Sequence, residues 1–158
     1  MPLTKLNATQ GLTGTLPAVS GANLTGISAG KVLQVVSGQV AGTNMINTSG
    51  YVGAGLSITP SSSSSKIQII MGGRTERYSG SSTDYNAIKL VRDTTDLYTF
   101  TDAHLHAVVN GVRQMFNVNY LDTPNTTSST QYRIYSTETG SGSVSFYQWW
   151  SLLEIEGW

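Results

Sequence analysis

The chain has 158 residues and a mass of 16.9 kDa, the size of one compact domain with a short extension. Charged residues make up only 11% of it, and nine basic and nine acidic side chains give a formal net charge of zero. This balance excludes nucleic-acid binding through counterion release, so no nucleic-acid partner is expected. The sequence has no cysteine, which excludes disulfides, thiolate metal sites and cysteine nucleophiles.

Neither a membrane span nor a secretory signal is visible in the sequence. No uninterrupted apolar run reaches the roughly 18 residues of a membrane-crossing helix, so no membrane insertion is expected. The first ten residues, MPLTKLNATQ, lack the basic and apolar regions of a signal peptide. Twenty serines and 20 threonines favour β-strands joined by tight turns. Because so low a charge makes a monomer poorly soluble, the composition also favours an oligomer.

The first 30 residues differ from the rest of the chain. Lys5 is their only charged residue, and glycine and proline interrupt them every few positions. Such a segment cannot bury enough apolar surface to stay folded alone. We interpret it as an extended arm that orders against other chains, with a flexible linker as the alternative. The arm is expected over residues 1–45 and a folded head over residues 46–158.

Short strands at spacings of roughly 8–12 residues are predicted through the rest of the chain. Apolar residues recur at every second position most clearly in residues 67–71, 116–120 and 132–136. Asn110-Gly111 predicts a tight hairpin, because a type I′ turn needs two residues that tolerate positive φ. In chain order, the predicted strands are 32–36 and 39–46 around a turn at 37–38, then 56–59, 66–73, 74–78, 85–91, 97–101, 103–109, 112–121, 132–136 and 144–156.

No amphipathic helix is predicted, and around ten short strands indicate an all-β sandwich or barrel. We expect a jelly-roll-like β-sandwich head that follows the N-terminal arm. The last predicted strand carries Glu154 and Glu156 on one face, and this face is expected to be exposed to solvent.

No catalytic set can be identified in the sequence. The chain lacks a G-x-S-x-G elbow, a phosphate-binding loop, a GxGxxG motif and an HExxH motif. A serine-histidine-aspartate arrangement cannot be selected from 20 serines. We therefore expect neither an enzyme nor a cofactor.

The only two histidines, His104 and His106, lie two residues apart, which puts them on one face of a predicted strand. In a trimer with that strand at the axis, imidazoles from three copies would surround one transition-metal ion. The histidines lie in the middle of the domain, on the less apolar face of their strand, and the motif is not repeated. We therefore expect ordinary surface or interface histidines and no metal.

Aromatic residues crowd the C-terminal part of the chain. Tyrosine and tryptophan suit interfaces because a large apolar body carries a polar tip. We expect them to pack within the domain or between subunits, with stacking on the sugar rings of a glycan as the alternative. The candidate receptor or interface residues are Tyr132, Tyr135, Tyr147, Trp149, Trp150 and Trp158.

Three segments resemble bacteriophage tail-fibre and fibre-like virion proteins, notably those of marine phages. LPAVSGANLTGISAGKVLQVVSG resembles their lead-in segment, and GLSITPSSSSSKIQIIMGG resembles a strand-loop-strand of their C-terminal β-domain. FNVNYLDTPNTTSSTQYRIYS, with the terminal LLEIE, resembles the last hairpins of that domain. The resemblance implies a virion protein made in the host cytoplasm, a homotrimer and a β-sandwich head on a narrow N-terminal stem. It implies no enzyme.

Two roles remain open at this point. In the first, the protein is a short trimeric fibre on the tail, whose arm binds another virion protein and whose head binds the host surface. A host-surface glycan is then a candidate partner. In the second, it is a capsid decoration or cement protein with a purely structural role. Fibres of the resembling kind are much longer, so either the arm is itself the anchor or the protein decorates a capsid.

Overall fold

The computed structural model describes residues 31–40, 49–79, 85–100, 112–139 and 143–157. Within these ranges the chain forms eight β-strands and no helix, which confirms the predicted all-β class. The strands are β1 (Val32–Val40), β2 (Gly50–Ile58), β3 (Lys66–Ser79), β4 (Tyr85–Arg92), β5 (Thr95–Phe100), β6 (Val112–Asp122), β7 (Thr130–Thr139) and β8 (Ser143–Ile155).

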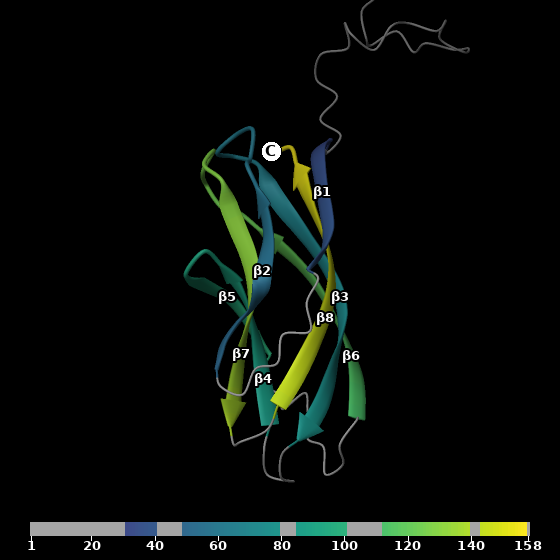
Figure 1. Ribbon diagram of the computed structural model, residues 1–158. Coiled ribbons are helices and arrows are strands. Elements are labelled where there is room, and N and C mark those ends of the chain that lie inside the picture. Colours follow the sequence, from purple (N-terminus) through teal and green to yellow (C-terminus); the bar gives the residue numbers. More distant parts are fainter. Residues whose placement is uncertain (1–30, 41–48, 80–84, 101–111, 140–142, 158) are drawn as a thin grey trace, which may run out of the picture.

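The strands form two four-stranded antiparallel sheets that face each other (Figure 1). The first has the order β1-β8-β3-β6 and is called the β3–β8 sheet after its central strands. The second has the order β2-β7-β4-β5 and is called the β4–β7 sheet. The pairs are nested, with β1 beside β8, β2 beside β7, β3 beside β6 and β4 beside β5. This nesting over two sheets is the strand pairing of a jelly roll.

The hydrophobic core fills the space between the two sheets. Apolar side chains at alternate positions of residues 67–71, 116–120 and 132–136 are buried or packed against this core, as their spacing predicts. Among the described residues, the largest fully buried side chain is that of Trp150. Its Nε1 donates a hydrogen bond to Oε1 of buried Gln148 at 2.9 Å. The buried indole therefore has a polar partner, and its burial stabilises the sandwich.

Two strands run further than the sequence predicts. β1 continues through Ser37-Gly38, where a hairpin was predicted, and β3 is one strand of 14 residues where two were predicted. The hairpin prediction is wrong because β8 offers β1 a continuous partner, which outweighs a weak local turn signal. β3 is continuous because it pairs with β6 on one side and β8 on the other.

β1 lies inside residues 1–45, the range expected for the arm, yet it is an edge strand of the sandwich. The sandwich therefore extends back to Val32. The earlier part of that range, residues 1–30, lies outside the described residues, as do the Asn110-Gly111 turn and the predicted strand 103–109.

β1 begins and β8 ends at one end of the sandwich, called here the terminal end (Figure 1). The β2–β3 connection of residues 59–65 and the β6–β7 connection of residues 123–129 lie at the same end. β6 and β7 belong to different sheets, so their connection crosses between the sheets. It is not the hairpin that the resemblance implied.

β2 departs from regular pairing with β7 between Val52 and Leu56. Gly53 and Gly55 lie in this stretch with φ angles of 70° and 71°. A Cβ atom on Gly55 would come within 2.1 Å of the carbonyl oxygen of Tyr132. Only glycine combines this left-handed conformation with so close an approach to the neighbouring backbone.

Candidate functional site

Glu154 is buried at the terminal end of the β3–β8 sheet, where a solvent-exposed face was predicted. Its carboxylate accepts hydrogen bonds from the backbone N and the hydroxyl of Ser61 at 2.7 and 2.6 Å, and from Nε2 of Gln34 at 2.7 Å. The prediction is wrong because even-numbered residues of β8 face the core, and Glu154 follows Leu152 in that series. Glu156 lies beyond the end of β8 and is exposed.

Two opposing effects set the pKa of Glu154. Burial acts to raise the pKa, but hydrogen bonds from Ser61 and Gln34 stabilise the carboxylate more strongly and lower the pKa to about 2. Each carboxylate oxygen already accepts from a donor of the chain itself. The group therefore joins β1, β8 and the β2–β3 connection, and its arrangement is that of a structural carboxylate.

A second buried carboxylate, that of Asp122, joins the two sheets. Nη1 of Arg92 lies 2.8 Å from both of its oxygens, and the Tyr132 hydroxyl donates to Oδ2 at 2.7 Å. Asp122 belongs to β6, whereas Arg92 and Tyr132 belong to the opposite sheet. Burial and the hydrogen bond to Asp122 raise the pKa of Tyr132 far above its usual value, so the phenol remains a donor.

The six aromatic residues predicted as receptor or interface candidates do not form one site. Tyr132 and Trp150 are buried in the core, so they pack within the domain. Trp158 lies outside the described residues. Tyr135 lies on the outer face of the β4–β7 sheet, where its ring meets that of Tyr51 edge-on, with centroids 5.2 Å apart.

Tyr147 and Trp149 lie together on the outer face of the β3–β8 sheet. From here on, "the outer face" without a sheet name means this one. Tyr147 is half-buried beneath Arg74, whose guanidinium carbon lies 4.2 Å from the ring centroid. Trp149 exposes 49% of its surface. Of the six predicted aromatics, Trp149 is thus the one that the described structure leaves open to solvent.

The outer face also carries apolar residues that the sequence analysis missed. The available signal was the apolar run Ile69-Ile70-Met71, because consecutive apolar residues predict a strand that is apolar on both faces. Ile69 and Met71 face the core, so Ile70 faces outward. The large apolar side chains exposed on the outer face include Val32, Val35, Ile70, Met115, Leu121 and Trp149.

Charged groups lie only towards the ends of the outer face, among the described residues. Lys66 starts β3 at the terminal end. Towards the opposite end, Glu76 accepts a hydrogen bond from Arg113 at 3.0 Å and lies 3.7 Å from Arg74. Between these ends, the polar side chains of the face are neutral and include Gln68, Asn117, Asn119 and Ser151.

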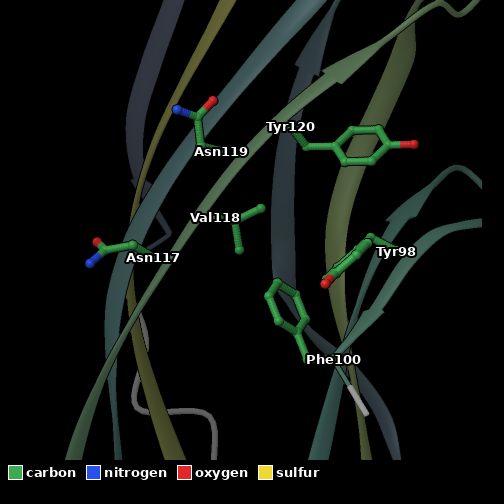
Figure 2. Close-up of a pocket in the computed structure, with 6 residues that line it drawn as sticks. All are labelled: Tyr98, Phe100, Asn117, Val118, Asn119 and Tyr120. Carbon is green, nitrogen blue, oxygen red and sulfur yellow. The ribbon is translucent and has the colours of Figure 1, made fainter. Parts of the chain in front are cut away.

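A small aromatic hollow opens at the edge of the sandwich between β5 and β6 (Figure 2). The rings of Tyr98, Phe100 and Tyr120 gather around it, and the Tyr98 and Phe100 rings meet edge-on with centroids 4.8 Å apart. Its volume of about 190 Å³ is below the roughly 300 Å³ at which small-molecule pockets begin. The hollow therefore has room for one side chain or one sugar ring. Its lining residues are Tyr98, Phe100, Asn117, Val118, Asn119 and Tyr120.

Among the described residues, no group of three or more histidines and carboxylates is placed to hold a metal ion. His104 and His106 lie outside these residues, so the expectation for them stays a prediction. No helix in the described ranges is long and apolar enough to cross a membrane.

No protein-family model matches the chain, and no curated protein sequence matches it. Among solved structures, infectious bursal disease virus of the Gx strain is similar, with 16% identity over 87% of this chain, 36% of that chain and a TM-score of 0.43. The VP2 subviral particle of the same virus is 15% identical over 76% of this chain and 32% of that chain, with a TM-score of 0.41. The T13 particle of this virus is 13% identical over 90% of this chain and 40% of that chain, with a TM-score of 0.41. The chain thus spans at most 40% of these three solved chains.

Proposed function

We propose that this chain is a non-enzymatic structural protein of a bacteriophage virion, a short trimeric fibre that presents its β-sandwich as a head to the host surface. Its N-terminal arm attaches it to another virion protein. The observation that carries the proposal is the resemblance to phage fibre proteins, together with where the resembling segments lie in the fold. GLSITPSSSSSKIQIIMGG, residues 55–73, covers the end of β2, the connection and the first part of β3, in keeping with the strand-loop-strand that the resemblance implies.

The polar groups of the described structure support a non-enzymatic role. The two carboxylates at the terminal end, Glu154 and Asp122, accept hydrogen bonds from the chain's own donors. Lys89 pairs with Asp96 at 2.6 Å, and Glu76 pairs with Arg113. The aromatic hollow contains no carboxylate and no histidine among its lining residues. It therefore suits contact with a ring or a side chain better than acid-base chemistry.

A capsid decoration or cement protein is the second candidate. The outer face favours it, because its centre is uncharged and exposes Ile70 and Trp149, and such a surface suits permanent contact with other protein better than repeated contact with a solvated receptor.

Locating the protein on particles tests the proposal. Antibody fragments raised against the purified chain are used to label virions of the phage that encodes it, and electron microscopy gives their position. Label at the tail supports the fibre, and label over the capsid lattice supports decoration. Virions without label would overturn both roles.

Removing residues 1–30 tests the attachment arm. All eight described strands lie after this segment, so the shortened chain retains every residue of the sandwich. We expect it to keep the circular dichroism of a β protein and to be missing from particles when the full chain is replaced. Normal incorporation of the shortened chain would exclude the arm as the anchor.

A further inference from the structure

The two outer faces of the sandwich differ in character. Two large apolar side chains of the β4–β7 sheet are exposed among the described residues, Tyr51 and Tyr98. Tyr98 lines the aromatic hollow, and Tyr51, on the outer face of this sheet, is covered by Arg133 with a guanidinium carbon 3.7 Å from the ring centroid. Lys89 and Asp96 form an ion pair on the same sheet. The outer face of the β3–β8 sheet has instead an uncharged centre, where Ile70 and Trp149 are exposed among neutral polar side chains. This contrast marks one side of the domain for burial against protein.

Strand register arranges the outer face as rows that cross the sheet. Val32, Ile155 and Lys66 lie at the terminal end, and Val35, Leu153, Gln68 and Leu121 form the first full row after them. The next row is Ser37, Ser151, Ile70 and Asn119, and the third is Gln39, Trp149, Gly72 and Asn117. Tyr147, Arg74 and Met115 form the fourth.

The composition of these rows is that of an interface. Tryptophan, tyrosine, methionine and arginine are enriched in protein interfaces, whereas lysine and carboxylates are depleted at the interface core. Trp149 and Met115 are 49% and 74% exposed, and Ile70 is 47% exposed at the centre of the sheet. Gly72 lies beside Trp149, and with no side chain there a shallow depression opens between Trp149 and Asn117. The face thus offers an apolar anchor next to a recess.

We propose that this outer face is where copies of the chain meet one another. The inference deepens the proposed trimeric assembly and rests on it. Neutral Gln, Asn and Ser side chains each donate and accept hydrogen bonds, so they can pair with the same set on a second copy. The net charge of zero means that copies do not repel one another as they approach. Charged groups lie towards the ends of the face, as in the polar rim of an interface.

The size of the face is sufficient for association. Four strands about 4.8 Å apart and four rows about 6.8 Å apart cover roughly 500 Å². Two such faces in contact would bury roughly 1,000 Å² in total, which is the lower limit for a specific interface. In the proposed trimer each face is divided between two neighbours around a three-fold axis, so the three faces together bury roughly 1,500 Å².

Light scattering of the full chain and two charge variants tests the inference. Ile70→Asp and Met115→Asp place a carboxylate on the face, and Thr99→Asp is the matched control on an exposed position of β5 in the other sheet. At 10 µM we expect the wild type and Thr99→Asp at three times the 16.9 kDa chain mass, and the two face variants at the chain mass. Unchanged circular dichroism identifies a folded monomer.

Single cysteines give a second measurement that a folding defect does not imitate, since the chain has no cysteine of its own. Ile70→Cys and Thr99→Cys are labelled with a maleimide at increasing protein concentration. We expect labelling of Ile70→Cys to slow at least tenfold as copies associate, and labelling of Thr99→Cys to stay constant.

The possible results distinguish a wrong contact face from a wrong oligomeric state. The wild type could be oligomeric, with both folded charge variants keeping its mass and Ile70→Cys labelled at an unchanged rate. That result would show that the outer face is not the contact, while the proposed oligomer would stand. A wild type at the chain mass overturns both. A monomer that binds neutral glycans on an array, and loses them in Ile70→Asp, assigns the face to a receptor and overturns the inference.

Discussion

The acid sensitivity of the sandwich depends in part on Glu154, and Glu154→Gln measures that dependence. The pKa of this carboxyl is about 2 in the folded chain and 4.5 for a free glutamate side chain. Because the folded pKa is the lower one, the carboxylate stabilises the fold above pH 4.5, and this contribution is lost as the pH falls towards 2. At roughly 1.4 kcal/mol per pH unit, the difference corresponds to about 3 kcal/mol.

The substitution replaces one carboxylate oxygen with an NH₂ group of similar size. That group must face a donor of Ser61 or the Nε2 donor of Gln34, so one hydrogen bond is lost together with the charge. At pH 7 we expect the free energy of unfolding to fall by about 3 kcal/mol. Near pH 2, about the folded pKa, half of the wild-type carboxyls are protonated, and the difference between the two proteins should shrink to below about 1 kcal/mol.

Urea unfolding followed by tryptophan fluorescence at fixed protein concentration, from pH 7 to pH 2, gives both stabilities. The control is Glu156→Gln, which removes an exposed carboxylate two residues further along. It should change stability by less than about 0.5 kcal/mol. Parallel stability curves for the wild type and Glu154→Gln across this range would refute the role assigned to Glu154.

Three further substitutions test other parts of the fold. Tyr132→Phe removes the donor to buried Asp122 and should cost about 1–2 kcal/mol, read as a lower calorimetric midpoint, whereas an unchanged midpoint would contradict the hydrogen bond. Gly55→Ala should lower the free energy of unfolding by about 3 kcal/mol in the same urea assay, since the new Cβ would meet the backbone of Tyr132 at a position of positive φ. Gly50→Ala, whose new Cβ would have no atom within 4 Å, should change it by less than about 0.5 kcal/mol. Leu152→Ala opens a cavity in the core and should cost about 2–5 kcal/mol in guanidinium unfolding; a smaller loss would mean that the core collapses around the site.

The sandwich could be predicted from the sequence where one face of a strand is apolar and the other polar. Residues 67–71 and 132–136 show this alternation, and both segments lie in the core as predicted. The lengths of β1 and β3 could not be predicted, because each continues along a partner strand distant in sequence. Local turn signals such as Ser37-Gly38 carry no information about that partner.

The functional surfaces were harder to predict for the same reason. Trp149 and Trp150 are adjacent, so alternation alone does not show which of them faces the core, and Glu154 was assigned to the solvent side. The partners that hold Glu154, Gln34 and Ser61, are 120 and 93 residues away in the sequence. The aromatic hollow depends on how close β5 and β6 lie across two different sheets, which no local pattern records.

The position of β1 determines how the domain responds to pulling. β1 is an edge strand paired antiparallel with β8 from Val32 to Val40. A load between Val32 and the far end of the sandwich acts along the strand, so the hydrogen bonds of β1 share it and yield together. A load between Val32 and Ile155, which are paired at the same end, separates the two strands one bond at a time. A domain tethered through Val32 and loaded at the far end of the sandwich is therefore pulled in the stronger direction of β1.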